Sequence, residues 1–294
     1  MSEHGQLAKK RVCITGASGF IGSNLTKIIE DDFEVVSFEG DLLDKDQVVE
    51  FFEKNKNIDQ IVHLVGLFSG SIAELINVNV NTLGNLIEEA NRNNIKKITY
   101  TSTGAVYGEP KEQESSEDDL LAPNTYYGLS KKIAEDLLQL AKDINGIDYC
   151  ILRFPNVYGE GNPKGVIYNF LSSIVDKGEV TIYGDGAQAR NFLHVSDACA
   201  AIRLAMNYEG SGLWNISNPK VVTINELVEM FKEKYSFKVN YLPANNNLKD
   251  LILNVDKAKE ELGFESKIKE VRIPELNEAD LIPIDESKSK ELIR

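Results

Sequence analysis

The chain has 294 residues, of which 42% are hydrophobic and 27% are charged, as is typical of a globular protein. Its formal net charge is −14, so we expect neither a nucleic-acid partner nor an anionic membrane surface, because both favour a basic face. No apolar run is long enough to span a bilayer, and the first residues lack the apolar core of a signal peptide. The three cysteines, Cys13, Cys150 and Cys199, fall in apolar or alanine-rich segments, which predicts buried thiols and a cytoplasmic protein.

Short apolar runs alternate with amphipathic segments along the first half of the chain. We expect strands over residues 12–14, 34–38, 60–65, 98–102 and 149–154. We expect helices that begin at Phe20 and that cover residues 45–56, 72–93 and 127–142. This alternation predicts an α/β fold with a Rossmann-like doubly wound parallel sheet, in which ligands bind beyond the carboxyl ends of the strands.

Three glycines follow the first strand at a spacing of three residues, within the segment TGASGFIG. Gly16 can adopt a backbone angle that side chains forbid, Gly19 lets backbone N–H groups approach a pyrophosphate, and Gly22 lets the helix pack closely. The helix N-terminus then presents its partial positive charge to the phosphates. The same glycines also fit an ordinary strand–turn–helix, but at the start of an alternating chain they favour a dinucleotide site.

The pattern changes after Phe154, where a turn-rich segment covers residues 155–164. Beyond it we expect helices over residues 166–176, 194–206, 224–234 and 256–262, a strand over 214–217 and a loop over 181–191. We therefore predict an NAD(P)-binding Rossmann domain over residues 9–155, with returning elements in about 191–217. A smaller mixed α/β substrate-binding lobe is predicted over residues 156–190 and 218–294.

Tyr127 and Lys131 stand four residues apart at the start of a helix, and therefore share one face of it. A nearby ammonium and an oxidised nicotinamide ring both favour a phenolate, so we expect a lowered pKa for Tyr127. Tyr127 can then exchange the proton of a substrate hydroxyl while hydride moves to or from the cofactor. Thr103, which follows the fourth strand, can hydrogen-bond the same oxygen. Such a Tyr–Lys pair is also common on helix surfaces, and the glycine turn makes the catalytic interpretation the better one.

Several segments together resemble the extended short-chain dehydrogenase/reductase family of nucleotide-sugar epimerases and dehydratases, over roughly Arg11 to Phe264. The matching segments are TGASGFIG, Gly40-Asp41-Leu42, TSTGAVYG, the Tyr-x-x-x-Lys pair at Tyr127 and Lys131, RFPNVYG and YGDGAQARNFLHVSD. The resemblance implies a homodimer built from the helices over residues 72–93 and 127–142, and apolar positions on more than one side of these helices favour it as well.

The resemblance also implies roles for individual residues of this chain. The catalytic residues would be Thr103, Tyr127 and Lys131. The substrate contacts would be Thr103, Asn156 and Arg190, the last of which would clamp a nucleotide phosphate. The cofactor contacts would be Gly16, Ser18, Gly19, Phe20, Ile21, Gly22, Glu39, Asp41, Leu42, Leu64, Val65, Gly66, Thr101, Tyr127, Lys131 and Phe154.

Some positions depart from the family pattern. Sugar 4,6-dehydratases carry an Asp-Glu pair after the catalytic threonine, where this chain has Gly104 and Ala105. The acid and base for eliminating water are therefore missing, and we expect neither dehydratase nor decarboxylase activity. Asn191 replaces the aspartate of the usual Arg-Asp-Phe, and the second phosphate-binding arginine has no equivalent nearer than Lys249.

Glu39 ends the second strand, where an acidic residue typically binds the ribose 2′-OH of NAD. No arginine lies nearby to bind a 2′-phosphate, so we predict NAD as the cofactor, with NADP left open. His63 lies within an apolar strand and His194 within the Arg190 segment, so we interpret both as structural residues. No cluster of cysteine and histidine has metal-ligand spacing, and we expect no metal.

The sequence therefore predicts an NAD(P)-dependent nucleotide-sugar epimerase that acts on a nucleotide-diphosphate sugar. Tyr127 would serve as the base while hydride leaves sugar C4, and the hydride would return to the other face of a 4-keto intermediate. An NAD(P)H-dependent 4-keto-(6-deoxy)sugar-nucleotide reductase with the same residues is the alternative. A non-catalytic dinucleotide-sensing module is less favoured, because it would have no need of Thr103, Tyr127 and Lys131.

Overall fold

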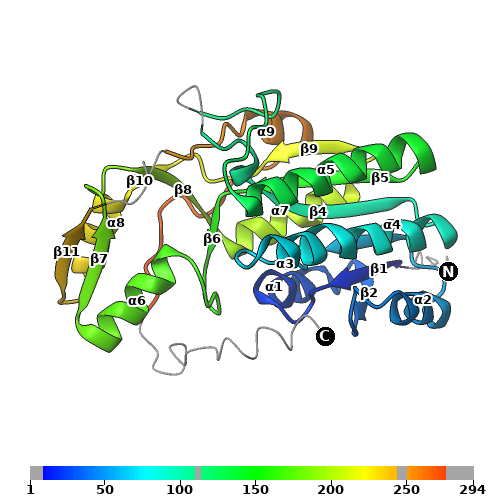
Figure 1. Cartoon of the computed structure of the whole chain (residues 1–294), viewed down its shortest axis with the longest axis horizontal. Helices are drawn as coiled ribbons and strands as arrows, with labels where there is room; N and C mark the ends of the chain where they lie inside the picture. The colour runs from blue at the N-terminus through cyan, green and yellow to red at the C-terminus, as the bar shows by residue number, and fades with distance from the viewer. Residues whose placement is uncertain (1–8, 110–113, 244–249, 276–294) are drawn as a thin grey trace, which may run out of the picture.

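The computed structural model describes residues 9–109, 114–243 and 250–275 (Figure 1). Its largest sheet has six strands in the order β2-β1-β3-β4-β5-β9, and every pair of neighbours is parallel. These strands are β1 (Lys10–Thr15), β2 (Phe33–Phe38), β3 (Gln60–His63), β4 (Lys97–Thr103), β5 (Asp148–Phe154) and β9 (Gly212–Asn215). The predicted parallel doubly wound sheet is confirmed.

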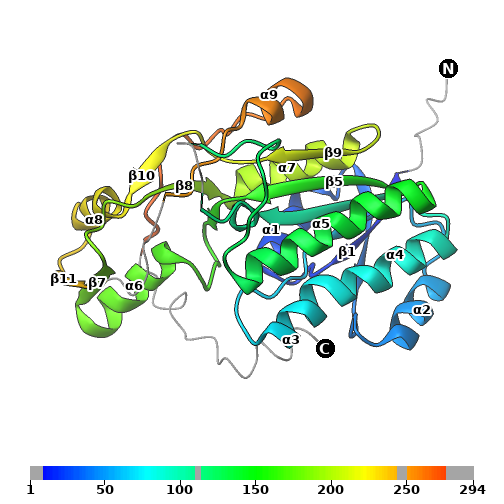
Figure 2. The ribbon, with the colours of Figure 1, turned by 45° about the horizontal axis from the view of Figure 1, so that its top comes forward.

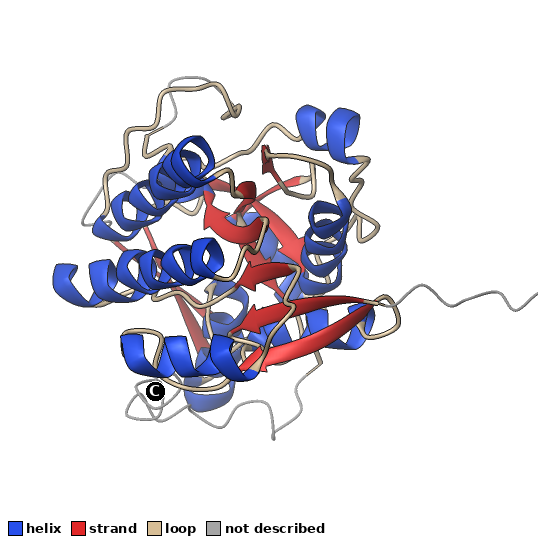
Figure 3. Ribbon diagram, turned by 90° about the vertical axis from the view of Figure 1, so that its right-hand side faces the viewer, coloured by secondary structure: helices blue, strands red, loops and turns tan. Residues whose placement is uncertain are grey.

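Helices cover both faces of this sheet, as the view in Figure 3 shows. One face packs against α1 (Phe20–Ile29), α7 (Val195–Asn207) and α9 (Asp256–Leu262). The other face packs against α2 (Lys45–Lys54), α4 (Thr82–Arg92) and α5 (Tyr126–Asn145). Along β1, Val12 and Ile14 lie in the first core and Cys13 lies in the second. A strand that is buried on both faces has a continuous apolar sequence, which is why β1 could be predicted.

The remaining strands form two smaller sheets, in the orders β10-β8-β6 and β11-β7, beside the large sheet (Figures 1 and 2). These strands are β6 (Asn156–Tyr158), β7 (Glu179–Tyr183), β8 (Ala189–His194), β10 (Val221–Thr223) and β11 (Lys238–Leu242). They pack with α6 (Val166–Lys177) and α8 (Ile224–Lys232) around a separate core that contains Phe170, Phe192 and Phe231. The domain boundaries drawn from the sequence stay a prediction.

The strand order reverses beside β1, because β2 lies on one side of it and the other four strands lie on the opposite side. Ligands of open α/β sheets bind in the crevice at such a reversal, here at the carboxyl ends of β1 and β3. Gly16 follows β1 with a φ of 73°, and a Cβ at this position would lie 3.2 Å from Val65. A Cβ on Gly22 would lie 2.1 Å from the carbonyl oxygen of Gly16, so the turn requires glycine at both positions.

Three sequence-based expectations about secondary structure are wrong. Residues 72–93 are not one regular helix but α3 (Ile72–Ile76), the π-helical segment η1 (Asn77–Asn81) and α4. Residues 181–191 are not a loop, because they contain the end of β7 and the start of β8, and the turn-rich segment 155–164 contains β6. Gly184 and Gly186 have positive φ in the turn between β7 and β8, and these glycines gave the loop signal. The other elements agree with the prediction within a few residues.

The three cysteines are buried free thiols, as predicted. Within the described ranges, no helix has the length and apolar character needed to cross a membrane, and no group of side chains could hold a metal ion. Helix α5 leaves Tyr126, Leu140 and Ile144 more than half exposed. The homodimer that would cover this face stays a prediction.

Candidate active site

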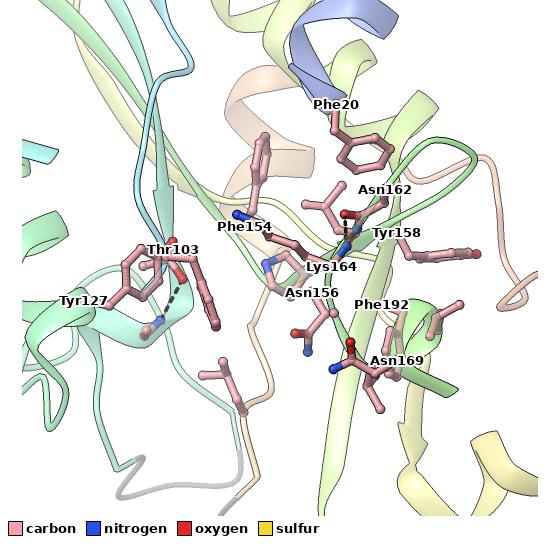
Figure 4. A pocket seen from close by; sticks show the side chains of 18 of the residues that line it. Phe20, Thr103, Tyr127, Phe154, Asn156, Tyr158, Asn162, Lys164, Asn169 and Phe192 are labelled. Atoms are coloured by element: carbon pink, nitrogen blue, oxygen red, sulfur yellow. Dashed lines mark hydrogen bonds between the residues drawn. The ribbon is translucent and has the colours of Figure 1, made fainter. Parts of the chain in front are cut away.

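A pocket of about 1080 Å³ lies between the carboxyl ends of the large sheet and the two smaller sheets. Thr103 and Tyr127 lie together on one side of it, and Asn156, Asn169 and Phe192 lie across from them (Figure 4). The predicted site residues that line it are Phe20, Ile21, Leu64, Gly66, Thr101, Thr103, Tyr127, Lys131, Phe154 and Asn156. The structure therefore brings the whole predicted catalytic set together.

The remaining predicted site residues do not line this pocket: Gly16, Ser18, Gly19, Gly22, Glu39, Asp41, Leu42, Val65 and Arg190. Glu39 is exposed directly after β2. The carboxylate of Asp41 accepts the backbone N–H of Leu43 at 2.9 Å, and Leu42 is buried. Asp41 and Leu42 therefore also shape the turn and the core, and the cofactor contacts assigned to this group stay predictions.

A tight contact between α5 and the end of β4 places Tyr127 next to Thr103. Thr125 caps α5 by accepting the N–H of Gly128 at 3.0 Å. A Cβ on Gly128 would lie only 2.4 Å from the carbonyl oxygen of Ala105, so a larger residue would push the helix away. The first turn of α5 therefore sits directly on the segment that follows Thr103, which brings Tyr127 and Thr103 together in the pocket lining.

The environment of Tyr127 differs from the expectation. Burial raises the pKa of its phenol above the ordinary value of 10, and the neighbouring hydroxyl of Thr103 only partly offsets this effect. In the protein without its cofactor, the prediction that Lys131 lowers the pKa of Tyr127 is therefore wrong. The reason is geometric, because Nζ of Lys131 donates to the carbonyl of Thr101 at 2.9 Å and lies 4.5 Å from the ring centre of Tyr100.

Lys131 is itself buried, and this burial lowers its pKa to about 8, although Glu135 acts in the opposite direction. Gly66 gives the ammonium room, since a Cβ there would lie 3.2 Å from Nζ. His63 is fully buried, shares a 2.6 Å hydrogen bond with Thr15, and has a pKa lowered to about 3 by burial and by the charge of Lys131. The interpretation of His63 as a core residue is confirmed.

The π-helical segment η1 carries a site residue that the sequence analysis missed. The fully buried Asn79 accepts the backbone N–H of Leu67 at 2.7 Å and donates to its carbonyl at 2.9 Å. Its amide also donates to Oγ of Ser130, at 2.9 Å, and this Oγ donates to the carbonyl of Tyr127. Asn79 thus ties the loop after β3 to the first turn of α5. The only sequence signal was a polar residue at a core position of an amphipathic helix.

A buried ion pair lies behind the predicted catalytic residues. Arg153 and Glu135 are 2.7 Å apart and almost wholly shielded from solvent. Ser102 donates to the same carboxylate, and Arg153 also donates to the hydroxyl of Tyr107 at 2.8 Å. These bonds lock α5 to β4, the strand that ends at Thr103, and to its neighbour β5.

Arg190 lies beside the pocket, although it is not part of its lining. It occupies β8, where its guanidinium donates to the carbonyl of Ala189 at 2.8 Å. Burial lowers its pKa, while the charge of Asp250 acts in the opposite direction. Gln188 and Phe192, each two residues from Arg190 and therefore on the same side of the extended chain, do line the pocket. The phosphate clamp assigned to Arg190 stays a prediction.

Two lysines that the sequence analysis missed, Lys164 and Lys177, line the pocket. Lys164 extends into it toward Phe154 (Figure 4). Asn162 shapes this turn, because its amide donates to the carbonyl of Val157 at 2.9 Å and its Oδ1 accepts the N–H of Lys164 at 3.0 Å. The turn-rich sequence concealed this arrangement. Lys249, the cation nearest in sequence to a second phosphate arginine, lies outside the described residues.

The chain was compared with known proteins. Residues 12–217 match the model of the NAD dependent epimerase/dehydratase family. The chain belongs to this family. It is 31% identical to a putative UDP-glucose 4-epimerase of Methanocaldococcus jannaschii, over 87% of this chain and 93% of that protein. It is also 31% identical to a dTDP-4-dehydro-6-deoxyglucose reductase of Escherichia coli, over 87% and 92% of the two chains.

Among solved structures, the UDP-glucose 4-epimerase of Thermotoga maritima with UDP-glucose superposes with a TM-score of 0.82 at 26% identity. That match covers 97% of this chain and 100% of the other. The comparisons confirm the extended short-chain dehydrogenase/reductase family, its fold and NAD as its cofactor. Relatives at 28% identity also include a UDP-glucuronic acid decarboxylase of Danio rerio and a dTDP-glucose 4,6-dehydratase of Streptomyces niveus. The reaction within the class therefore needs an argument from the site.

Proposed function

We propose that this chain is an NAD-dependent nucleotide-sugar 4-epimerase. The observation that carries the proposal is the placement of Thr103 and Tyr127 together in the pocket lining, next to the buried ammonium of Lys131. Tyr127 accepts the proton of the sugar C4 hydroxyl, and Thr103 holds the same oxygen. NAD held at the glycine turn would supply the hydride acceptor for C4, and the pocket would let the 4-keto sugar turn over before the hydride returned to its other face.

The protein's own groups fit such a cofactor. Gly19 is the N-cap of α1 and contributes no side chain to it, so the first N–H groups of the helix are available to a pyrophosphate. The narrow turn that Gly16 and Gly22 permit brings this helix end close to β1 and β3. Burial raises the pKa of Tyr127, so the positive charge of an oxidised nicotinamide beside it would favour the phenolate form.

The charge of the pocket supports an anionic substrate. The described residues that line it include Lys131, Lys164 and Lys177 but no aspartate, glutamate or histidine. A pocket that is locally positive in a chain of net charge −14 fits the diphosphate of a nucleotide sugar. The same lining argues against the dehydratase and decarboxylase reactions of some relatives, because these need an acid or base beside the reacting carbons.

A reductase of 4-keto sugars is the second candidate, favoured by the Escherichia coli relative at 31% identity. It would use Thr103, Tyr127 and Lys131 once in each turnover, with NAD(P)H from solution. The two reactions are separated by assaying a panel of nucleotide sugars and their 4-keto forms, with and without added NADH and NADPH. Epimerised product without added cofactor supports the epimerase. Consumption of 4-keto sugars only with reduced cofactor supports the reductase. If neither the nucleotide sugars nor their 4-keto forms are turned over, both candidate functions are contradicted.

A further inference from the structure

Part of the pocket wall near Thr103 is aliphatic, because Ala105 and Leu251 both line the pocket. The hydroxyls of Ser102 and Thr125, which also line it, are already bonded within the protein. Gly104 is buried, and a Cβ at this position would lie 3.1 Å from Cδ2 of Leu253 and 3.3 Å from Cδ1 of Leu251. Leucine side chains therefore fill the space beside the catalytic threonine, and they offer no hydrogen-bond partner to a substrate.

Leu251 is held in this place from both sides of its extended segment. Its backbone N–H donates to the carbonyl of Ala189 at 3.2 Å, and the N–H of Leu253 donates to Oδ1 of Asn191 at 2.8 Å. On the opposite side, the backbone of Ser115 bonds the two residues that flank Leu253, at 2.8 and 2.9 Å. Side chains two residues apart in an extended segment face the same way, which is why Leu251 and Leu253 both reach Gly104.

Asn191 stands where the family usually has an aspartate, and its side chain helps to hold the segment that carries Leu251. While its Oδ1 accepts from Leu253, its Nδ2 donates to the carbonyl of Asn218 at 3.0 Å. A carboxylate could accept the first bond but could not donate the second. The buried amide therefore fixes the segment that carries Leu251 to the end of the large sheet.

The chemistry of a hexose limits what this wall can face. With the C4 oxygen at Thr103 and Tyr127, the neighbouring groups are the C3 hydroxyl and the C6 group on C5. Only C6 can be fully apolar, as the methyl group of a 6-deoxy sugar. A hydroxyl pressed against Leu251 and Ala105 would lose its bonds to water, whereas a methyl group loses none and buries apolar area. Across the pocket, Asn156 supplies a polar group for hydroxyls (Figure 4).

We infer that the substrate is a nucleotide 6-deoxyhexose, or its 4-keto form, whose C6 methyl group packs against Leu251 and Ala105. The inference rests on the proposed function, since Thr103 and Tyr127 locate sugar C4. Leu251 is then the residue that sets specificity at C6, although it is far in sequence from every catalytic residue.

The test uses the full chain loaded with NAD and two sugars that differ by one oxygen, UDP-glucose and UDP-6-deoxyglucose. The dissociation constant is measured for each sugar beside kcat/KM, so that the comparison of binding does not depend on turnover. We expect the 6-deoxy sugar to be preferred by about 10- to 100-fold, the range for one group in an apolar pocket. Leu251→Thr, which adds a hydroxyl to the wall, should reduce this preference toward unity.

Leu253→Val is the matched control, because Leu253 packs under Gly104 without lining the pocket. It should lower Tm slightly and leave the ratio between the two sugars unchanged. Equal or tighter binding of UDP-glucose, or an unchanged ratio in a folded Leu251→Thr variant, overturns the inference and leaves the proposed function intact. If both sugars bind in the expected ratio but neither reduces the bound NAD nor is epimerised, the preference for a C6 methyl group is supported and the proposed epimerase function is overturned.

Discussion

Nζ of Lys131 donates a 2.9 Å hydrogen bond to the backbone carbonyl of Thr101, two residues before the catalytic threonine. This bond fixes a buried ammonium between α5 and β4, next to the pocket but without an acid in direct contact. Glu135, the nearest carboxylate that acts on it, is held by Arg153 and Ser102. The chain therefore keeps a cation buried where its charge opposes folding, at the place where the proposed reaction would use it.

Lys131→Met should abolish turnover and stabilise the fold. Burial lowers the pKa of Lys131 from 10.5 to about 8, so between these values the unfolded chain binds more protons than the folded chain. The contribution of Lys131 to the free energy of unfolding is thus lowest below pH 8 and rises toward pH 10.5. At pH 7 the variant should gain roughly 2–3 kcal/mol in the free energy of unfolding. Urea unfolding at pH 7 and pH 10 checks this, and an advantage that does not shrink at pH 10 would contradict it.

Arg153→Met should destabilise the protein by about 3–5 kcal/mol, because it leaves the carboxylate of Glu135 buried without its partner. The control is Lys54→Met, which breaks the exposed pair with Glu50 and should cost less than about 1 kcal/mol. Both changes are measured by urea unfolding at pH 7. Equal effects of the two substitutions would show that the buried pair contributes no more than a surface pair.

The glycine turn and the Tyr–Lys pair could be predicted because their chemistry depends on residue type and local spacing. Gly16 needs its positive φ wherever the turn occurs, and Tyr127 lies one helical turn from Lys131 in any α-helix. The positions of Asn79 and Leu251 could not be predicted in this way. Asn79 depends on a π-helical segment, and Leu251 depends on bonds between segments that are distant in sequence.

The pKa of Tyr127 shows the same limit. The spacing to Lys131 predicts a neighbouring cation, but not that the ammonium turns toward the carbonyl of Thr101. Nor does the sequence reveal how much solvent the fold removes from the phenol. These two tertiary effects reverse the direction of the shift for the protein alone.

NAD should bind at least about tenfold more tightly than NADP, because the exposed carboxylate of Glu39 would repel a 2′-phosphate. Glu39→Arg should narrow or reverse this preference. Glu53→Arg, the same charge change on the exposed side of α2, should not. Calorimetric titration of both cofactors into the three proteins gives the ratios. Preferential binding of NADP by the wild type would contradict the assignment of Glu39 and favour the reductase.

Arg190→Ala should weaken binding of the nucleotide sugar by about 2 kcal/mol or more, as expected for a lost charge-assisted contact, and leave NAD affinity nearly unchanged. The control is Arg203→Ala, which removes an exposed arginine of α7 that pairs with Asp32. Titration with UDP-glucose and with NAD separates the two sites. Weaker NAD binding with normal sugar binding would show that the two ligands have been placed wrongly.

The central claim is that Tyr127 moves the proton during hydride transfer, and kcat of Tyr127→Phe beside Tyr126→Phe tests it most directly. Tyr126 precedes it in α5 and is exposed, so its substitution removes an equivalent hydroxyl outside the site. Both variants should keep the wild-type affinity for NAD. Tyr127→Phe should lower kcat by about 100-fold or more, while Tyr126→Phe stays near the wild type. A Tyr127→Phe variant that turns over nucleotide sugars at nearly the wild-type rate would remove Tyr127 from the mechanism.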